Sequence, residues 1–170
     1  MTPICGDIYA RAILEMGMTE RPERSAAVSS SDVNGRIEIE VEGFRFVGRL
    51  ECERAPLTCR FIRLMLPLNS SVLHCRWSGE SVWIPFAEPE VPLPFENHTS
   101  HPHPGQLLIY AHGFSEPEIL MPYGSCAFNS KVGQLAGNHF LTLESGVSDL
   151  AELGRQVLWH GAKAISFKAL

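Results

Sequence analysis

Residues 36–42 alternate strictly between apolar and charged side chains, and this pattern constrains the fold more than any other feature of the chain. The apolar members are Ile37, Ile39 and Val41, each followed by a glutamate. Successive side chains of a strand point to opposite faces of its sheet, so the pattern predicts a strand with one buried and one wet face. Gly43 supplies a turn, and residues 44–53 return as the second strand of a hairpin.

Short strand-like segments separated by glycine and proline recur along the rest of the chain. We expect strands at residues 72–77, 80–85, 106–111, 118–121, 125–128, 132–135, 139–143 and 164–167. The proline-rich segment 87–104 predicts a long irregular loop, which in a compact domain is often functional. Many short strands joined by such turns indicate a barrel or a sandwich.

Two amphipathic helices are expected among these strands. Pro56 suits the first position of one helix. Its apolar stripe is Leu57, Phe61, Leu64, Met65 and Leu68. The other helix begins at Ser148 as N-cap and ends at Gly161. Its stripe is Leu150, Leu153, Val157 and Leu158. Because each stripe must cover an apolar opening, the sequence predicts a mostly β fold, a closed barrel of about eight strands with two capping α-helices.

Residues 1–35 differ from residues 36–170, which we expect to form the barrel domain. Residues 5–18 predict a short helix with Tyr9, Ile13 and Met16 on one side, and residues 20–34 are polar and rich in serine. The extension is expected to be either a flexible tail or an arm that docks on a neighbouring subunit of a homo-oligomer.

Composition narrows the partners and the compartment. The net charge of −5 and the pI of about 5.8 show no excess of basic residues of the kind that binds nucleic acid or an anionic membrane. No apolar run approaches the roughly 18 residues that a spanning helix needs. The five cysteines include no CxxC pair, which is typical of reduced, buried thiols in a cytoplasmic protein.

Several motifs, in their order along the chain, resemble those of cyclophilins. They are Val41-Glu42-Gly43, Gly48-Arg49-Leu50, Ala55-Pro56-Leu57-Thr58 and Pro104-Gly105-Gln106-Leu107. Residues 76–83 and 128–139 are similar to a bacterial family of cyclophilin-like domains with no assigned function. The resemblance implies a cyclophilin-like barrel with a ligand site on its outer face, centred on an arginine of the third strand.

Arg76 is the residue that matches this arginine. Leu73, Cys75 and Trp77 share one face of the strand by alternation, and if that face is the core, Arg76 projects outward. The phenylalanine-methionine-Xaa-glutamine cluster that follows the arginine in prolyl isomerases is replaced here by Ser78, Gly79 and Glu80. The resemblance therefore implies the barrel more than the isomerase activity.

The predicted ligand site combines charged, aromatic and amide side chains. Its members are Arg76, Trp77, Glu80, His112, Tyr123, Asn129 and Lys131. A guanidinium presents bidentate donors to a carboxylate or carbonyl, and aromatic rings stack on planar ligands. Each member also has a structural alternative: a salt bridge between Arg76 and Glu80, core packing of the aromatic rings, and turn hydrogen bonds for His112 and Asn129.

Signatures of catalysis and metal binding are weak. His98, His101 and His103 have the spacing HxxHxH, but no aspartate or cysteine stands nearby, so we predict a solvated loop and no metal site. The chain contains no nucleophile elbow, P-loop or dinucleotide fingerprint, and we expect no cofactor.

Three functions from different classes follow from these patterns. The first is a binding domain for a small polar molecule or a short peptide. The second is an enzyme with unknown catalytic residues, either a weak or degenerate peptidyl-prolyl isomerase or a small-metabolite enzyme. The third is a structural or assembly protein that uses the N-terminal arm.

Overall fold

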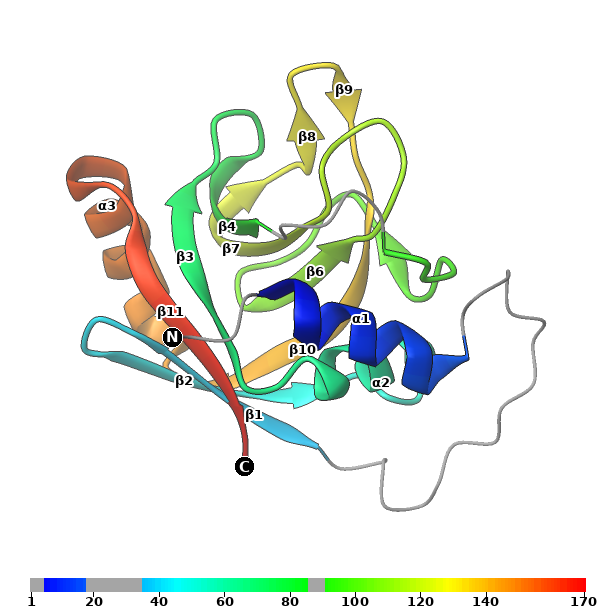
Figure 1. Ribbon diagram of the computed structural model, residues 1–170. Helices are drawn as coiled ribbons and strands as arrows, with labels where there is room; N and C mark the ends of the chain where they lie inside the picture. The colour runs from blue at the N-terminus through cyan, green and yellow to red at the C-terminus, as the bar shows by residue number, and fades with distance from the viewer. Residues whose placement is uncertain (1–4, 18–34, 86–90) are drawn as a thin grey trace.

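Eight antiparallel strands close into a barrel in the computed structural model, which describes residues 5–17, 35–85 and 91–170 (Figure 1). Around the barrel the order is β2 (Phe44–Leu50), β1 (Arg36–Val41), β11 (Lys163–Ala169), β3 (Leu68–His74), β4 (Gly79–Pro85), β7 (Glu118–Cys126), β6 (Gln106–Tyr110) and β10 (Gly137–Ser145). Pairing of β10 with β2 closes the ring. The predicted mostly β fold with a closed barrel of about eight strands is confirmed.

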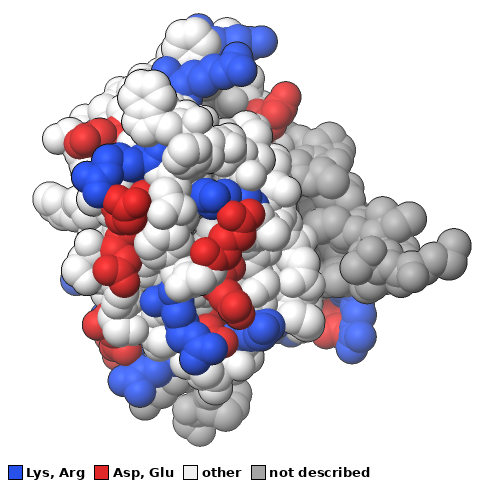
Figure 2. Space-filling model, turned by 90° about the vertical axis from the view of Figure 1, so that its left-hand side faces the viewer, with Lys and Arg blue, Asp and Glu red and all other residues white. Residues whose placement is uncertain are grey.

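The hairpin predicted from the alternating segment is β1 and β2. Its isoleucines and Val41 are buried in the core, and Gly43 adopts the positive φ of 94° that the turn requires. The outward glutamates form ion pairs with neighbouring strands, as in Lys163–Glu42 at 2.8 Å and Arg45–Glu38 at 3.4 Å. Acidic and basic side chains accordingly interleave on this side of the molecule (Figure 2). This face therefore presents no extended surface of one charge.

Among the described residues, three short strands lie outside the ring. β5 (His98–Thr99) pairs with β10, and β8 (Asn129–Ser130) pairs with β9 (Gly133–Gln134) in a separate small hairpin. The strands predicted at 118–121 and 125–128 are one strand, β7. The strand predicted at 72–77 begins earlier and ends at His74, so the following residues form the turn to β4. Residues 86–90 of the predicted loop lie outside the described residues.

Helices α2 (Pro56–Leu64) and α3 (Leu150–His160) pack on the barrel core. Of the predicted stripe of α2, Phe61, Met65 and Leu68 are buried in the core, whereas Leu57 and Leu64 are half-buried. The helix ends at Leu64, so Met65 caps it and Leu68 begins β3. In α3, Leu158 is 46% exposed, against the prediction. The predicted N-cap at Ser148 is also wrong, because it lies in a preceding 3-10 turn, η2 (Val147–Asp149). Gly161 ends α3 as predicted, with φ of 88°.

The amino end of α2 is capped by a distant side chain. Ala55 at the N-cap has no side-chain acceptor, so the carboxylate of Glu96 accepts the backbone N–H groups of Leu57 and Thr58 at 3.2 and 2.8 Å. Asn138 on β10 donates to the Thr58 hydroxyl at 2.9 Å and accepts from the Glu96 N–H at 3.0 Å. These bonds fasten the loop before β5 to both the helix and the barrel, and a carboxylate suits the positive end of a helix.

Helix α1 (Cys5–Met16) lies beside α2 (Figure 1). Ala12 is fully buried, and Arg60 of α2 donates to the Glu15 carbonyl at 3.1 Å. The helix predicted at residues 5–18 is therefore present. The polar segment that follows it in the sequence lies outside the described residues.

Apolar side chains pack on both sides of the barrel wall. The inner cluster fills the barrel, and an outer cluster consists of Cys75, Leu108, Tyr110, Leu120, Phe128 and Leu135. Val72 belongs to the inner cluster, so Cys75 faces outward and Trp77, in the turn, is 57% exposed. The condition under which Arg76 would project outward, that Leu73, Cys75 and Trp77 face the core, is therefore not met. An alternating pattern cannot distinguish inside from outside where both faces are covered.

Candidate functional site

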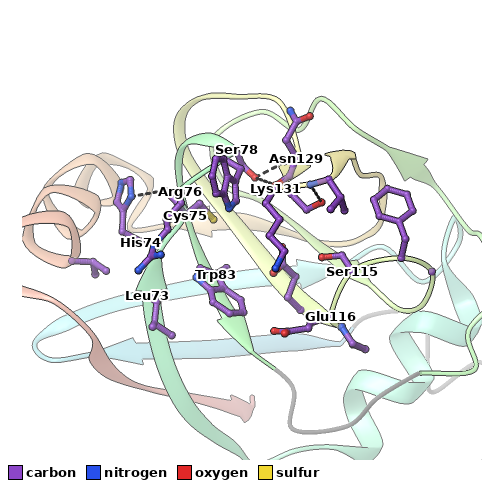
Figure 3. A pocket seen from close by; sticks show the side chains of 18 of the residues that line it. Leu73, His74, Cys75, Arg76, Ser78, Trp83, Ser115, Glu116, Asn129 and Lys131 are labelled. Atoms are coloured by element: carbon purple, nitrogen blue, oxygen red, sulfur yellow. Dashed lines mark hydrogen bonds between the residues drawn. The ribbon is translucent and has the colours of Figure 1, made fainter.

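A groove with a volume of about 1030 Å³ opens on the outer face of the barrel (Figure 3). Its walls are the turn from β3 to β4, the loop at residues 113–117 and the turn between β8 and β9. Trp83 of β4 and Glu118 of β7 line it from the barrel wall. Trp83 pairs with Leu120, and Glu118 stands two residues before Leu120, so strand alternation places all three on the outer face. The groove is thus an opening beside the outer cluster.

Two cations stand on different walls of this groove. Arg76 comes from the turn after β3 and Lys131 from the β8–β9 turn, and both are exposed. Figure 3 draws Trp83 between them. Among the described residues, neither side chain has a hydrogen-bond or ion-pair partner. Their donors are therefore available to an anionic ligand in the groove.

Glu118 is a half-buried carboxyl group in the same groove. Burial raises its pKa to about 7, and repulsion from Glu116 contributes in the same direction. Within the described part of the chain, no side chain or backbone group hydrogen-bonds to it. A carboxyl group in this state exchanges a proton near neutral pH, when the charges around it change.

The β7–β8 connection is fixed by hydrogen bonds at Ser78 and Asn129. The Ser78 hydroxyl donates to the Asn129 carbonyl at 2.9 Å and accepts from the Asn129 N–H at 3.1 Å. The Asn129 side chain donates to the Ala127 carbonyl at 2.8 Å. Asn129 therefore lines the groove, and its side chain also holds the turn. Such turn hydrogen bonds were the structural alternative to ligand binding that the sequence offered for this residue. This bonding positions Lys131 two residues later.

Tyr123 does not line the groove. Its hydroxyl lies 2.8 Å from Nε2 of His74, whose Nδ1 lies 2.7 Å from the Cys75 carbonyl. Because a carbonyl only accepts, Nδ1 carries a proton, and in the neutral ring Nε2 accepts from the tyrosine. Burial, and to a lesser degree Glu80, raises the pKa of Tyr123. Tyr123 thus orients His74, which does line the groove.

Glu80 lies at a second, smaller pocket of about 580 Å³, with His101 and His103. Its carboxylate accepts the Ser125 N–H at 2.8 Å. The salt bridge to Arg76, which was the structural alternative, is therefore not formed. Glu80 stabilises the end of β7 instead.

His112 lies away from both pockets. Its Nε2 donates to the Leu93 carbonyl at 3.0 Å, and its ring stacks on Phe95 at 5.2 Å. His98 stacks on the same phenylalanine at 4.5 Å. The HxxHxH segment is thus divided between two places. Across residues 5–17, 35–85 and 91–170, no group of three or more His, Cys, Asp or Glu is arranged to hold a metal.

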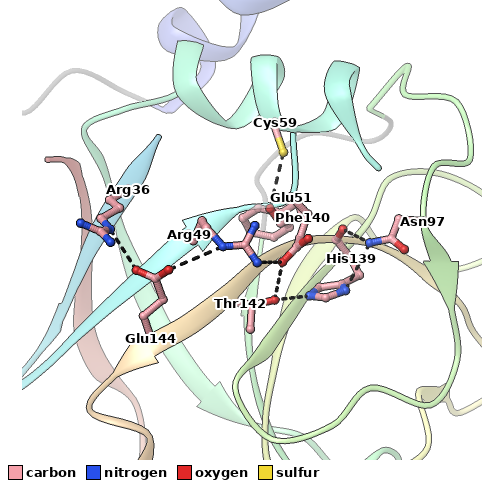
Figure 4. Close-up of polar contacts among 9 residues, drawn as sticks. All are labelled: Arg36, Arg49, Glu51, Cys59, Asn97, His139, Phe140, Thr142 and Glu144. Carbon is pink, nitrogen blue, oxygen red and sulfur yellow. Dashed lines mark hydrogen bonds and ion pairs between the residues drawn. The ribbon is translucent and has the colours of Figure 1, made fainter. Parts of the chain in front are cut away.

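A polar network joins β2, β10 and the loop before β5 (Figure 4). His139 donates from Nε2 to the Thr142 hydroxyl at 3.0 Å, and Thr142 donates to Glu51 at 2.7 Å. Asn97 donates to His139 at Nδ1, 3.2 Å away, and at the carbonyl, 2.9 Å away. Arg49 completes the chain with Glu51 at 3.1 Å. Because each polar group already has a partner, the network stabilises the fold.

Four of the seven predicted residues therefore meet at the groove, namely Arg76, Trp77, Asn129 and Lys131. Glu80, His112 and Tyr123 lie elsewhere. Sequence reasoning missed Glu118. Its signal was a carboxylate at the start of a strand that is otherwise apolar, but the sequence does not reveal that the outer face of that strand is partly covered.

Comparisons with known proteins support the fold and a family. A family model described as "Protein of unknown function (DUF3830)" matches residues 37–169. The solved structure of McbB in complex with tryptophan is similar, with a TM-score of 0.61 and 18% identity over 78% of this chain and 44% of that chain. The chain thus spans less than half the length of McbB.

The solution structure of the hypothetical protein AF2241 from Archaeoglobus fulgidus is also similar. Its TM-score is 0.53, with 14% identity over 83% of this chain and 98% of that chain. At these identities the likeness shows the barrel fold alone, and the likeness to cyclophilins stays a prediction. None of the curated proteins compared matches the sequence. No described helix has the length and apolar character needed to cross a membrane.

Proposed function

The chain belongs to the DUF3830 family of proteins of unknown function, and from its groove we propose that it binds a small molecule with an anionic group and a planar apolar part. The observation that carries the proposal is the pair of cations, Arg76 and Lys131, that face the groove without a described partner. A carboxylate between them would accept charge-assisted hydrogen bonds, which are about twice as strong as neutral ones. A short peptide ending in a carboxylate meets the same requirement.

Aromatic side chains supply the apolar part of the proposed site. Trp83 lies between the cations, Trp77 is exposed at the rim, and both line the groove. Indole rings provide a large flat surface for a planar group. The similar barrel of McbB has been solved with tryptophan, which is itself an aromatic carboxylate. That ligand supports the proposed class.

Calorimetry with a matched pair of ligands tests the proposal. Indole-3-propionate carries the anion, and indole-3-propionamide replaces it by a neutral group of the same shape. We expect the anion to bind at pH 7 and the amide to bind at least about tenfold more weakly, which corresponds to about 1.4 kcal/mol. R76Q and K131Q should each remove most of this preference, because each deletes one cation from the groove.

The matched control is R45Q, which removes a cation from the ion-paired face formed by β1 and β2. It should leave both affinities unchanged. Equal affinity for the anion and the amide, or an R76Q/K131Q double variant that binds the anion as well as the wild type, would refute the proposed site. The alternative of a degenerate prolyl isomerase predicts a rate above background in a protease-coupled assay, and R76Q should lower that rate, because Arg76 matches the central arginine of the cyclophilin site.

A further inference from the structure

We propose that the ligand of the groove is amphoteric: besides its anion it carries an ammonium group, which binds at Glu118. This inference rests on the proposed function, because it concerns the same groove and keeps Arg76 and Lys131 as the anion site. It adds a second recognition element and thereby names the ligand class as an aromatic amino acid or the equivalent end of a peptide.

Glu118 lies in the barrel wall at the start of β7. It is the first residue of β7, paired with Pro85 of β4 on one side and Tyr110 of β6 on the other. Its side chain lies on the outer face, two residues along the strand from Leu120, which pairs with Trp83. The carboxyl group therefore enters the groove from the barrel wall, beside the indole that we assign to the planar part of the ligand.

Charged groups of both signs surround Glu118 in the groove. Among the described residues, the titratable or charged groups that face it from the neighbouring elements are Glu116, Arg76, Lys131, His74, Cys75 and Tyr110. The groove thus holds two cations and two carboxyl groups, and in the described part of the chain none of these four forms an ion pair with another. Figure 3 shows Glu116 and Ser115 on a wall different from that of Arg76. Unpaired charges of both signs along one groove complement a ligand that has both.

The protonation state of Glu118 should depend on which ligand is bound. In the empty groove its carboxyl group is partly protonated at neutral pH, because burial without a hydrogen bond disfavours the charge. An ammonium group beside it would stabilise the carboxylate and release the proton. A ligand with only an anion would repel the carboxylate and retain or take up the proton. The two kinds of ligand should therefore respond to pH in opposite directions.

The experiment compares tryptophan with indole-3-propionate and tryptamine at pH 6 and pH 8. The first ligand has both charges, the second only the anion, and the third only the ammonium group. We expect tryptophan to bind up to about tenfold more tightly at pH 8 than at pH 6, and indole-3-propionate up to about tenfold more weakly, because a carboxyl group with a pKa near 7 ionises over this range. E118Q should remove both slopes.

Proton release in the unaltered protein provides a measurement that does not depend on a variant. Calorimetry at pH 7 in buffers of different ionisation enthalpy should report proton release with tryptophan and uptake with indole-3-propionate. E116Q is the matched variant, since it removes the more exposed carboxylate of the same groove and should reduce the slopes without abolishing them.

The outcomes separate this inference from the proposed function. If indole-3-propionate depends on Arg76 and Lys131 but binds as tightly as tryptophan at pH 8, or if tryptophan releases no proton, the amphoteric ligand is refuted and the anion site stands. If neither ligand depends on the two cations, the proposed function fails, and with it this inference.

Discussion

Four glutamates show how the same side chain takes different roles according to its partners. Glu96 accepts from two backbone N–H groups and a hydroxyl at the end of α2, and Glu51 accepts from Thr142 and Arg49. Glu80 holds the Ser125 N–H, whereas Glu118 has no described hydrogen-bond partner. A half-buried carboxyl group that the fold itself leaves without a hydrogen bond is the one most able to respond to a ligand.

His139 provides a prediction at the residue scale. Burial lowers its pKa, an effect that outweighs the opposing influence of Glu51. The folded protein therefore favours the neutral ring, and its contribution to stability is present above the ordinary pKa of about 6.5 and is lost as the pH falls through the lower folded value. Protonation at Nδ1 would also set a donor against the Asn97 amide, which now donates to that atom.

The raised pKa of Glu118 stabilises the folded protein as the pH falls over the same range, so the contribution of His139 is a difference between two proteins. Between pH 7 and pH 5 we expect the free energy of unfolding of the wild type to change by roughly 1 kcal/mol more in the destabilising direction than that of H139Q. Urea denaturation at each pH measures it. H160Q, at an exposed histidine that ends α3, is the control and should leave the slope unchanged. A slope in H139Q equal to that of the wild type would show that His139 is not the group responsible.

At the scale of elements, the sequence predicts a strand or helix best where one face is wet. The β1–β2 hairpin and the end of α3 at Gly161 follow from alternation and from a glycine at the helix end. The orientation of β3 cannot be predicted from alternation, because the strand is covered on both sides. Val72 is buried on the inner face of the barrel wall and Cys75, just after the strand, is buried on the outer face. Arg76 was identified as a candidate, but the groove also needs the β8–β9 hairpin to cover the barrel, and that long-range packing has no local signal.

Gly154 provides a prediction at this scale, with a sign opposite to that of helix propensity. Alanine is favoured over glycine inside a helix by about 1 kcal/mol. In α3, however, a Cβ at this position would overlap the ring of Tyr123, which is held by its hydrogen bond to His74. We expect G154A to destabilise the protein by about 1–3 kcal/mol, as overpacking does.

A double-mutant comparison isolates this contact. In a Y123A background the ring is absent, so G154A should become neutral or stabilising. Thermal and urea denaturation of the four proteins give the interaction energy. Equal effects of G154A in both backgrounds would mean that the contact with Tyr123 does not explain why α3 has a glycine at this position.

At the scale of the whole molecule, the feature to explain is the N-terminal extension. From the sequence it is either a flexible tail or an arm that docks on another subunit. In the structure α1 lies on α2 of its own chain, with Ala12 buried and Ile13 and Met16 packed against the core. We propose that α1 is an integral cover of the barrel's α2 side, and that the barrel is less stable without it.

Removal of residues 1–34 tests this proposal in the full protein. We expect the deletion to lower the free energy of unfolding by about 1–3 kcal/mol, because apolar surface on α2 becomes exposed at roughly 25 cal/mol per Å². The mass measured by light scattering should fall only by the mass of the deleted residues. A12E, which forces an unpaired charge into the contact while keeping the chain length, should reproduce the loss of stability. L14E, at an exposed position of the same helix, is its control. An assembly that dissociates on deletion would instead identify the extension as an arm between subunits, and unchanged stability would identify it as a tail.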